Sequence, residues 1–371
     1  MPLRDNPVEP LLGEHSLILL AGERHRREKK LMSPPFHGER MRAYGEIMRD
    51  RALAEARRWR EGDKVSMQAA MREITLDVIL RAVLGIESEP RGERFRRAVG
   101  TMLDAYVPSL FFFPELRRPL FGPWSRFVKI RDTVCELFRS ETVERRRVGT
   151  AGRKDILSLL IDARYEDGAA LNEGELVDEL RQLIVGGQDT LTTALVWGMF
   201  HLHRSPAALE RLRAELAPLG PVPSPEALAQ LPYLGAVCDE TLRMYPIVPL
   251  IPRRAARPLS FRGHPVVPGQ NILLATHLLH TNPDIWSEPH RFSPERFLAK
   301  KYSPFEYAPF GGGARRCLGA AFSVYLMRIV LGTIIASTRF APHEGPVPAR
   351  IVMSIVMAPR GVVKLTVERA P

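Results

Sequence analysis

The chain has 371 residues, of which 45% are hydrophobic, so it can bury a substantial core and a disordered chain is excluded. Its 53 Lys and Arg residues outnumber the 42 Asp and Glu residues, and the net charge of +11 favours an anionic partner at some part of the surface. The basic residues lack the aromatic interleaving of a nucleic-acid groove, so we expect no nucleic-acid partner.

Three cysteines, Cys135, Cys238 and Cys317, lie far apart in the sequence. This spacing favours neither a disulfide framework nor a zinc cluster, and it suits a reducing, cytoplasmic setting. The first residues resemble neither a signal peptide nor a membrane anchor. We therefore expect no membrane anchor in the chain as given.

Residues 1–205 are predicted to be mainly helical, because apolar residues recur there every three or four positions. Amphipathic helices are expected over residues 40–60, 65–84 and 126–147, and an apolar connection over residues 107–114. A further long helix is predicted to begin after Asn172, a residue type that caps helices, and to continue to about residue 203.

The middle of this long helix contains Gly186 and Gly187, followed by the polar residues Gln188, Asp189 and Thr190. Each glycine costs about 1 kcal/mol relative to alanine in a helix interior. We therefore predict that another group approaches the helix backbone closely at this point.

Residues 206–371 are predicted to be a mixture of helices and short strands. A β-like segment covers residues 271–276, an apolar helix runs from residue 318 to about 337, and strands are expected over residues 350–357 and 362–367. The sequence contains no internal repeat and no low-complexity linker, so we expect a single domain over residues 1–371.

The strongest chemical signal is Cys317, which follows a glycine-rich loop and directly precedes a predicted helix. The helix start offers free N–H groups and a positive dipole end, both of which stabilise a thiolate. Glycines permit a flat ligand to approach, and Arg315 can bind a carboxylate of that ligand. A dinucleotide-binding loop would need glycine at Arg316, and a structural free cysteine would not explain the surrounding residues. Haem satisfies all of these demands.

The loop resembles the cysteine signature F-x-x-G-x-R-x-C-x-G of the cytochrome P450 family. Its fixed positions are matched by Phe310, Gly313, Arg315, Cys317 and Gly319. The family's E-x-x-R signature is matched by Glu240 and Arg243, and its P-E-R-F signature by residues 294–297. The resemblance implies that Glu240, Arg243 and Arg296 form a buried network that holds the cysteine loop in place, whereas an isolated pair of this spacing is normally a solvated surface bridge.

The central-helix glycines and their neighbours resemble the family motif [A/G]-G-x-[D/E]-T. By resemblance, Gly186 and Gly187 lie against the distal face of the haem, while Asp189 and Thr190 relay protons to bound oxygen. The spacing of His25 and Lys29 is similar to the family's pair of propionate-binding residues, although the second is usually arginine, which forms a bidentate contact. Arg253 resembles a further propionate-binding residue, with Arg254 as its rival.

The resemblance begins at about Leu12 and implies a mainly α fold with small β-sheets, the cytochrome P450 fold, shortened at its N-terminus. It implies a monooxygenase that uses haem b (iron protoporphyrin IX), O2, and electrons from NAD(P)H through a separate ferredoxin or flavodoxin type donor. The substrate would be a hydrophobic small molecule such as a lipid or terpenoid. Alternatives are a peroxide-driven or isomerising haem-thiolate enzyme, and a truncated, catalytically impaired haem-binding protein.

The expected walls of the substrate pocket are residues 107–113, 183–191, 247–251 and 353–357, which are largely apolar. His277 and His280 have a spacing that a metal site uses, but no third ligand stands nearby in the sequence. Ordinary packing is therefore the preferred interpretation of both histidines.

Overall fold

The computed structural model describes residues 7–36, 38–86, 89–353 and 356–370. It is mainly helical with small sheets, as the sequence predicts. The α-helices are α1 (Glu9–Leu12), α2 (Gly22–Met32), α3 (Glu39–Ala56), α4 (Met67–Leu84), α5 (Glu89–Ala105), α6 (Pro108–Phe112), α7 (Gly122–Val148), α8 (Ile156–Asp162), α9 (Glu173–Arg204), α10 (Pro206–Leu216), α11 (Pro225–Gln230), α12 (Pro232–Met244), α13 (Thr276–His280), α14 (Glu295–Ala299) and α15 (Ala320–Ser337).

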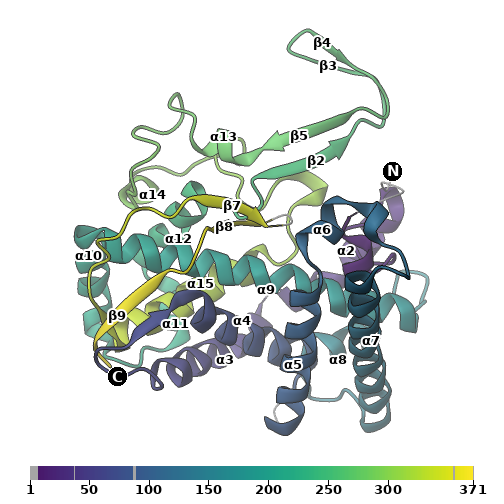
Figure 1. Ribbon diagram of the computed structural model, residues 1–371, viewed down its shortest axis with the longest axis horizontal. Coiled ribbons are helices and arrows are strands. Elements are labelled where there is room, and N and C mark those ends of the chain that lie inside the picture. The colour runs from purple at the N-terminus through teal and green to yellow at the C-terminus, as the bar shows by residue number, and fades with distance from the viewer. Residues whose placement is uncertain (1–6, 37, 87–88, 354–355, 371) are drawn as a thin grey trace.

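Within the described residues, the strands form four small antiparallel sheets. Their bounds are β1 (Lys64–Ser66), β2 (Leu250–Arg254), β3 (Leu259–Phe261), β4 (His264–Val266), β5 (Asn271–Ala275), β6 (Arg339–Phe340), β7 (Arg350–Met353), β8 (Val356–Pro359) and β9 (Lys364–Arg369). One sheet has the order β1-β9-β6, and the others pair β2 with β5, β3 with β4, and β7 with β8. The β3–β4 hairpin projects away from the rest of the molecule (Figure 1).

Three local predictions differ from the structure. The strand expected over residues 350–357 is divided between β7 and β8, which pair antiparallel with each other. The helix expected from Val65 begins at Met67, because Val65 belongs to β1 and the Ser66 side chain caps the helix by accepting a hydrogen bond from the Ala69 N–H. The segment expected as a connection at residues 107–114 contains the short helix α6, which begins at Pro108. Proline suits that position because its fixed φ matches a helix and its missing N–H would have no partner there.

Helix α9 begins where the sequence predicts. The Asn172 side chain accepts a hydrogen bond from the Glu175 N–H at 2.9 Å, and the Glu175 carboxylate accepts one from the Asn172 N–H at 2.9 Å. This reciprocal pair is a capping box, which satisfies two backbone donors at the start of the helix. The helix then crosses the middle of the molecule and contacts α4, α12 and α15 (Figure 1). Most residues of α9 are therefore packed against other elements.

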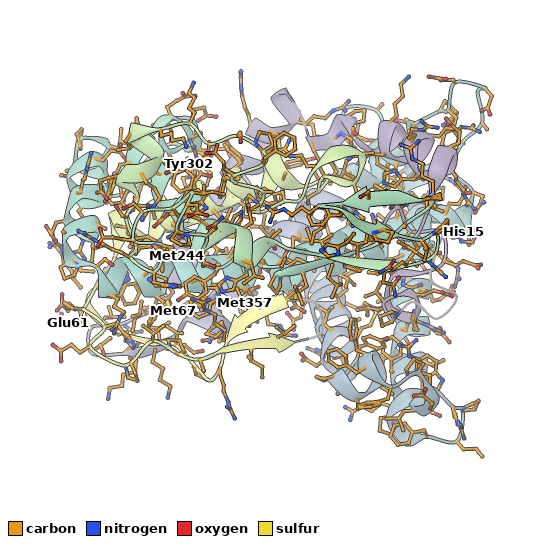
Figure 2. The ribbon with its side chains drawn as sticks, turned by 90° about the horizontal axis from the view of Figure 1, so that it is seen from above. His15, Glu61, Met67, Met244, Tyr302 and Met357 are labelled. Atoms are coloured by element: carbon orange, nitrogen blue, oxygen red, sulfur yellow. The ribbon has the colours of Figure 1, made fainter. Side chains whose placement is uncertain are left out.

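The core surrounds α9 and α15. Viewed with side chains, Met67, Met244 and Met357 lie inside the molecule, with 0%, 5% and 4% of their surfaces exposed, whereas His15 and Glu61 lie toward its two ends (Figure 2). Within the described residues, α15 alone is long and apolar enough to cross a membrane, but 61% of it is buried inside the protein. Such burial is typical of a core helix.

Candidate functional site

Cys317 lies between a short 3-10 turn, Gly313–Arg315, and the start of α15. The backbone of Gly311 and Gly313 has φ angles of +67° and +62°, a region that residues with a side chain rarely adopt. The Cys317 N–H donates a hydrogen bond to the Phe310 carbonyl at 3.0 Å, which closes the loop. The glycines thus permit the turn that brings the thiol into place.

The Cys317 side chain is solvent-accessible, yet burial raises the pKa of its thiol. A hydrogen bond from the Gly319 backbone and the positive charges of Lys29 and Arg316 act in the opposite direction and favour the thiolate. The thiol is thus solvent-accessible although protein atoms surround it. It remains accessible to a group that binds beside the loop.

The middle of α9 is also open on one side, although most of the helix is buried. A Cβ at Gly186 would meet no atom within 4 Å, whereas a Cβ at Gly187 would come within 3.1 Å of the Ile79 Cδ1 atom on α4. The absence of a side chain at Gly187 therefore relieves packing against α4, and at Gly186 it leaves open space. Asp189 is exposed, yet burial among the surrounding protein atoms raises the pKa of its carboxyl.

The polar side chains beside the two glycines have distinct partners. The Thr190 hydroxyl donates to the Gly186 carbonyl at 2.8 Å and to the Gly187 carbonyl at 3.2 Å. Gln188 is fully buried, and its Nε2 donates to the carbonyl of Arg72 on α4 at 3.2 Å. Gln188 therefore holds α9 against α4, and the acid and the alcohol remain on the open part of the helix.

Several basic side chains gather near the cysteine loop without acidic partners. The pKa of Arg315 is lowered by burial and by the charge of Arg253. The pKa of His25, which is 5% exposed, is lowered to about 4 by burial and by the charges of Arg315 and Lys29. Among the described residues, no carboxylate forms an ion pair with Arg253, Arg315 or Lys29. A ligand with two carboxylates would supply the missing negative charge, so haem fits this site.

The structure distinguishes Arg253 from its neighbour Arg254. Successive side chains of a strand point to opposite faces, and on β2 it is Arg253 whose charge acts on Arg315. The Arg254 side chain donates instead to the Gly269 carbonyl at 2.9 Å. Lys29 donates to the carbonyls of Ala314 and Arg316 at 2.6 and 2.9 Å, so it binds the cysteine loop directly.

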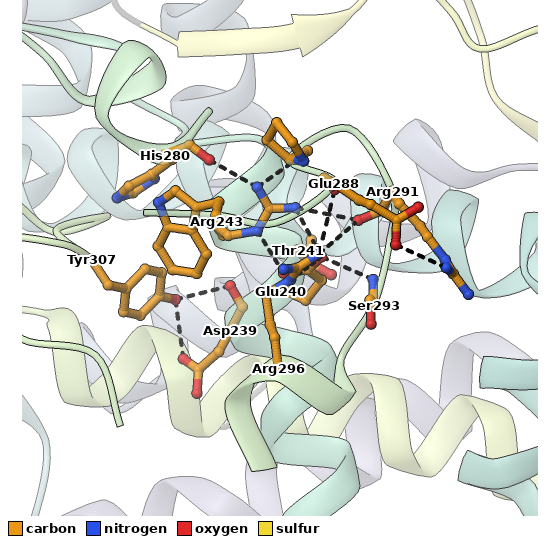
Figure 3. A network of polar contacts seen from close by, with 12 residues as sticks. Asp239, Glu240, Thr241, Arg243, His280, Glu288, Arg291, Ser293, Arg296 and Tyr307 are labelled. Carbon is orange, nitrogen blue, oxygen red and sulfur yellow. Dashed lines mark hydrogen bonds and ion pairs between the residues drawn. The ribbon is translucent and has the colours of Figure 1, made fainter. Parts of the chain in front are cut away.

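Glu240, Arg243 and Arg296 form a network inside the protein (Figure 3). Arg243 donates from Nε and Nη2 to the two Glu240 carboxylate oxygens at 2.6 and 2.8 Å, and Arg296 Nε donates to Glu240 at 3.1 Å. The side chains of Glu240 and Arg243 are 0% exposed. The pair is therefore a buried ion pair rather than a solvated surface bridge.

The other donors of this network bind backbone carbonyls. Arg243 Nη1 donates to the carbonyls of His280 and Pro289 at 2.8 and 2.9 Å, and Arg296 Nη1 donates to the Ser287 carbonyl at 3.0 Å. These hydrogen bonds fix the segment between α13 and α14. The hydrogen bonds of the three side chains thus stop short of the cysteine loop.

Sequence reasoning missed two side chains that hold the segment just before the cysteine loop. The His280 Nε2 atom accepts a hydrogen bond from the Ala308 N–H at 2.9 Å, and the Tyr307 hydroxyl donates to the Asp239 carbonyl at 3.0 Å. These partners are separated by 28 and 68 residues in the chain. No local pattern signals such distant contacts, and packing was the preferred interpretation of His280.

Comparison with known proteins gives concordant results. The sequence model of the family described as Cytochrome P450 matches residues 8–365. Cytochrome P450 137 of Mycobacterium tuberculosis is 31% identical over 358 residues, which are 95% of this chain and 73% of that protein. Cytochrome P450 138 of Mycobacterium bovis is 33% identical over 331 residues, which are 88% of this chain and 72% of that protein.

Solved structures show the same fold. The structure of retinoic acid bound cyanobacterial CYP120A1 matches with a TM-score of 0.89 and 24% identity, covering 99% of this chain and 84% of that one. The cytochrome P450DA heme domain matches with a TM-score of 0.87 and 22% identity, covering 99% of this chain and 82% of that one. At this level of identity, the likeness concerns the fold alone.

Proposed function

Because the chain belongs to the cytochrome P450 family, we propose that Cys317 binds the iron of haem b and that the protein inserts one oxygen atom of O2 into a hydrophobic small molecule. The observation that carries this proposal is the accessible, desolvated Cys317 thiol beside basic side chains without counter-ions. Haem, when bound, would supply the activation of dioxygen that no amino-acid side chain can perform.

The residues around the cysteine fit the binding of haem. We assign the thiolate to Cys317 and the binding of propionates to His25, Arg253 and Arg315, with Lys29 beside them. Burial and neighbouring charge lower the pKa of His25 to about 4, so its ring is neutral and can share a hydrogen bond with a carboxylate. The remaining assigned residues would line the haem pocket. They are Phe310, Gly313 and Gly319 in the cysteine loop, and Gly186 and Gly187 on α9.

Asp189 and Thr190 are assigned to proton transfer. Burial raises the pKa of Asp189, which brings the carboxyl nearer to the range in which it both accepts and releases protons. The charge of Arg72 opposes this shift and that of Asp104 adds to it. The Thr190 hydroxyl donates to the Gly186 carbonyl, so its oxygen lone pairs remain available to accept a hydrogen bond from water or from another donor.

The substrate is proposed to be a hydrophobic molecule such as a lipid or terpenoid. Of the predicted pocket walls, residues 247–251 and β8 come together, because the Met357 N–H donates to the Ile247 carbonyl at 2.8 Å. The same strand reaches α9 through Trp197, whose Nε1 donates to the Met357 carbonyl at 3.2 Å. These apolar segments suit an apolar ligand. The wall predicted at residues 354–355 lies outside the described residues, as does the Met353 side chain.

Electrons are proposed to come from NAD(P)H through a separate ferredoxin or flavodoxin type donor. Lys29 of α2 lies next to the cysteine loop. Other basic side chains of this helix form ion pairs with carboxylates: Arg24, Arg26, Arg27 and Lys30. Arg316, at the cysteine itself, is exposed. A basic surface beside the thiolate would attract an acidic electron donor.

The iron ligand is tested by substitution of the cysteines. Cys317→Ser should abolish the long-wavelength band of the reduced carbon monoxide complex, because an alcohol does not supply thiolate donation. Cys135→Ser, at a buried cysteine elsewhere in the fold, should retain the band and serves as the matched control. An unchanged spectrum of Cys317→Ser would remove Cys317 as the ligand. Turnover with a redox partner and NAD(P)H, compared with turnover driven by peroxide, then distinguishes a monooxygenase from a peroxide-driven enzyme.

A further inference from the structure

The buried Glu240–Arg243–Arg296 network and the cysteine loop are connected through His280. The main-chain carbonyl of His280 accepts a hydrogen bond from Arg243 Nη1 at 2.8 Å. The ring of the same residue accepts one from the Ala308 N–H at 2.9 Å. Figure 3 shows the contact of the His280 carbonyl with Arg243. His280 therefore binds the network with its backbone and the start of the loop with its side chain.

The connection continues from Ala308 to the cysteine. The Ala308 carbonyl accepts a hydrogen bond from the Gly311 N–H at 3.0 Å, and the carbonyl of Phe310, the adjacent residue, accepts one from the Cys317 N–H at 3.0 Å. Each of these backbone bonds spans a turn of the loop. The orientation of the Cys317 backbone thus depends on where Ala308 is held.

The His280 ring is well suited to hold Ala308. It is 0% exposed and packs beside two aromatic rings, with centroid distances of 5.4 Å to Tyr307 and 6.2 Å to Trp286. A backbone N–H can only donate, so Nε2 is the acceptor and the ring proton lies on Nδ1. Burial and the Arg243 charge lower the pKa of His280 to about 4, which keeps the ring neutral at neutral pH. The acceptor is therefore present and has little freedom to turn away.

We propose that His280 is a positioning residue for the thiolate ligand, which transmits the rigidity of the buried Glu–Arg–Arg network to the cysteine loop through its hydrogen bond with Ala308. The inference rests on the proposed function, in which Cys317 is the iron ligand. Without the ring acceptor, Ala308 would lose its anchor, and the loop would more readily take positions in which the thiolate no longer reaches the metal.

The test compares variants of the haem-loaded protein. His280→Leu removes the acceptor and keeps an apolar side chain, and His280→Gln keeps an acceptor at similar reach. The matched control is His203→Leu, because His203 is also buried (1% exposed) and bonds a backbone carbonyl, that of Met199, at 2.7 Å. The readout is the fraction of the reduced carbon monoxide complex that retains the long-wavelength band. It is measured at equal haem content, over a series of urea concentrations that are too low to unfold the protein globally.

For each protein, the urea concentration at which the band is lost is divided by the urea midpoint of global unfolding. We expect this ratio to be several-fold lower for His280→Leu than for the parent protein. His280→Gln should recover most of the difference, and His203→Leu should lose the band only as it unfolds. Equal behaviour of His280→Leu and His203→Leu, or no recovery in His280→Gln, would overturn the inference. A parent protein without the band would overturn the proposed function, and this inference with it.

A second measurement applies even if His280→Leu does not accumulate. In the haem-loaded parent protein, the Ala308 amide should exchange its hydrogen much more slowly than the exposed amides of the β3–β4 hairpin, because it is bonded to a buried acceptor. Exchange at the same rate as those amides would show that the hydrogen bond is absent in solution and would overturn the inference.

Discussion

Removal of the Arg243 side chain should destabilise the protein far more than removal of an exposed arginine that also lies three residues after its glutamate partner. In Arg243→Ala, the Glu240 carboxylate stays buried and, among the described residues, keeps as donors Arg296 Nε at 3.1 Å and the Ser293 N–H at 2.9 Å. It loses two charged donors, at 2.6 and 2.8 Å. The carbonyls of His280 and Pro289 lose their arginine donor as well.

The expected loss of free energy of unfolding follows from these contacts. Breaking a buried ion pair by removing one partner costs about 3 to 5 kcal/mol, and a buried acceptor left without a donor adds about 1 to 3 kcal/mol. Since a typical protein has a total stability of about 5 to 15 kcal/mol, the variant should lose a large part of it. Haem-loaded protein should accumulate poorly at growth temperature.

The control is Arg147→Ala, which removes one side of the Glu144–Arg147 pair. This pair has the same i,i+3 spacing and an N–O distance of 2.8 Å, but its side chains are 70% and 40% exposed. Exposed pairs contribute at most about 1 kcal/mol, so urea unfolding of this variant should resemble that of the parent protein. The reasoning is refuted if Arg243→Ala and Arg147→Ala lose the same free energy of unfolding.

Two further predictions concern the central helix. Thr190→Ala should uncouple turnover, so that reductant is consumed to form hydrogen peroxide instead of product. Thr190→Ser keeps the hydroxyl and should stay coupled. Equal coupling in both variants would contradict the proton relay. Glu179 is fully buried, and burial, together with the charge of Glu28, raises the pKa of its carboxyl from 4.5 to about 9. The free energy of unfolding should therefore fall as the pH rises from about 4.5 to about 9, by at most about 1.4 kcal/mol per pH unit. Urea unfolding of Glu179→Gln should show a smaller decline over the same pH range. An equal decline in the variant would show that the Glu179 carboxyl does not cause it.

Local sequence patterns determined much of the fold and the chemistry. The periodic apolar residues predicted α3, α4 and α7, and Asn172 marked the start of α9, because helix formation and capping depend on residues only three or four positions apart. The residues around Cys317 identified the candidate ligand for the same reason. A glycine turn, a cation and a helix start all lie within ten positions of one another.

Boundaries were less predictable where a distant segment competes with a local preference. Val65 continues the apolar pattern of α4, but it pairs with Leu365 of β9 and so belongs to a strand. The pairing partner lies at the other end of the chain. A helical pattern that is judged from neighbouring residues alone does not reveal this pairing.

The sequence by itself predicted that Glu240, Arg243 and Arg296 act together and that Cys317 and the α9 motif carry the chemistry. Only the tertiary structure decided that the ion pair is fully buried, that Gly187 packs against Ile79 while Gly186 faces open space, and that Arg253 rather than Arg254 faces Arg315. It alone brought the His280 ring to the Ala308 N–H. The physical reason is that burial, desolvation and most side-chain hydrogen bonds depend on which distant segments pack together, and this packing is a property of the whole chain.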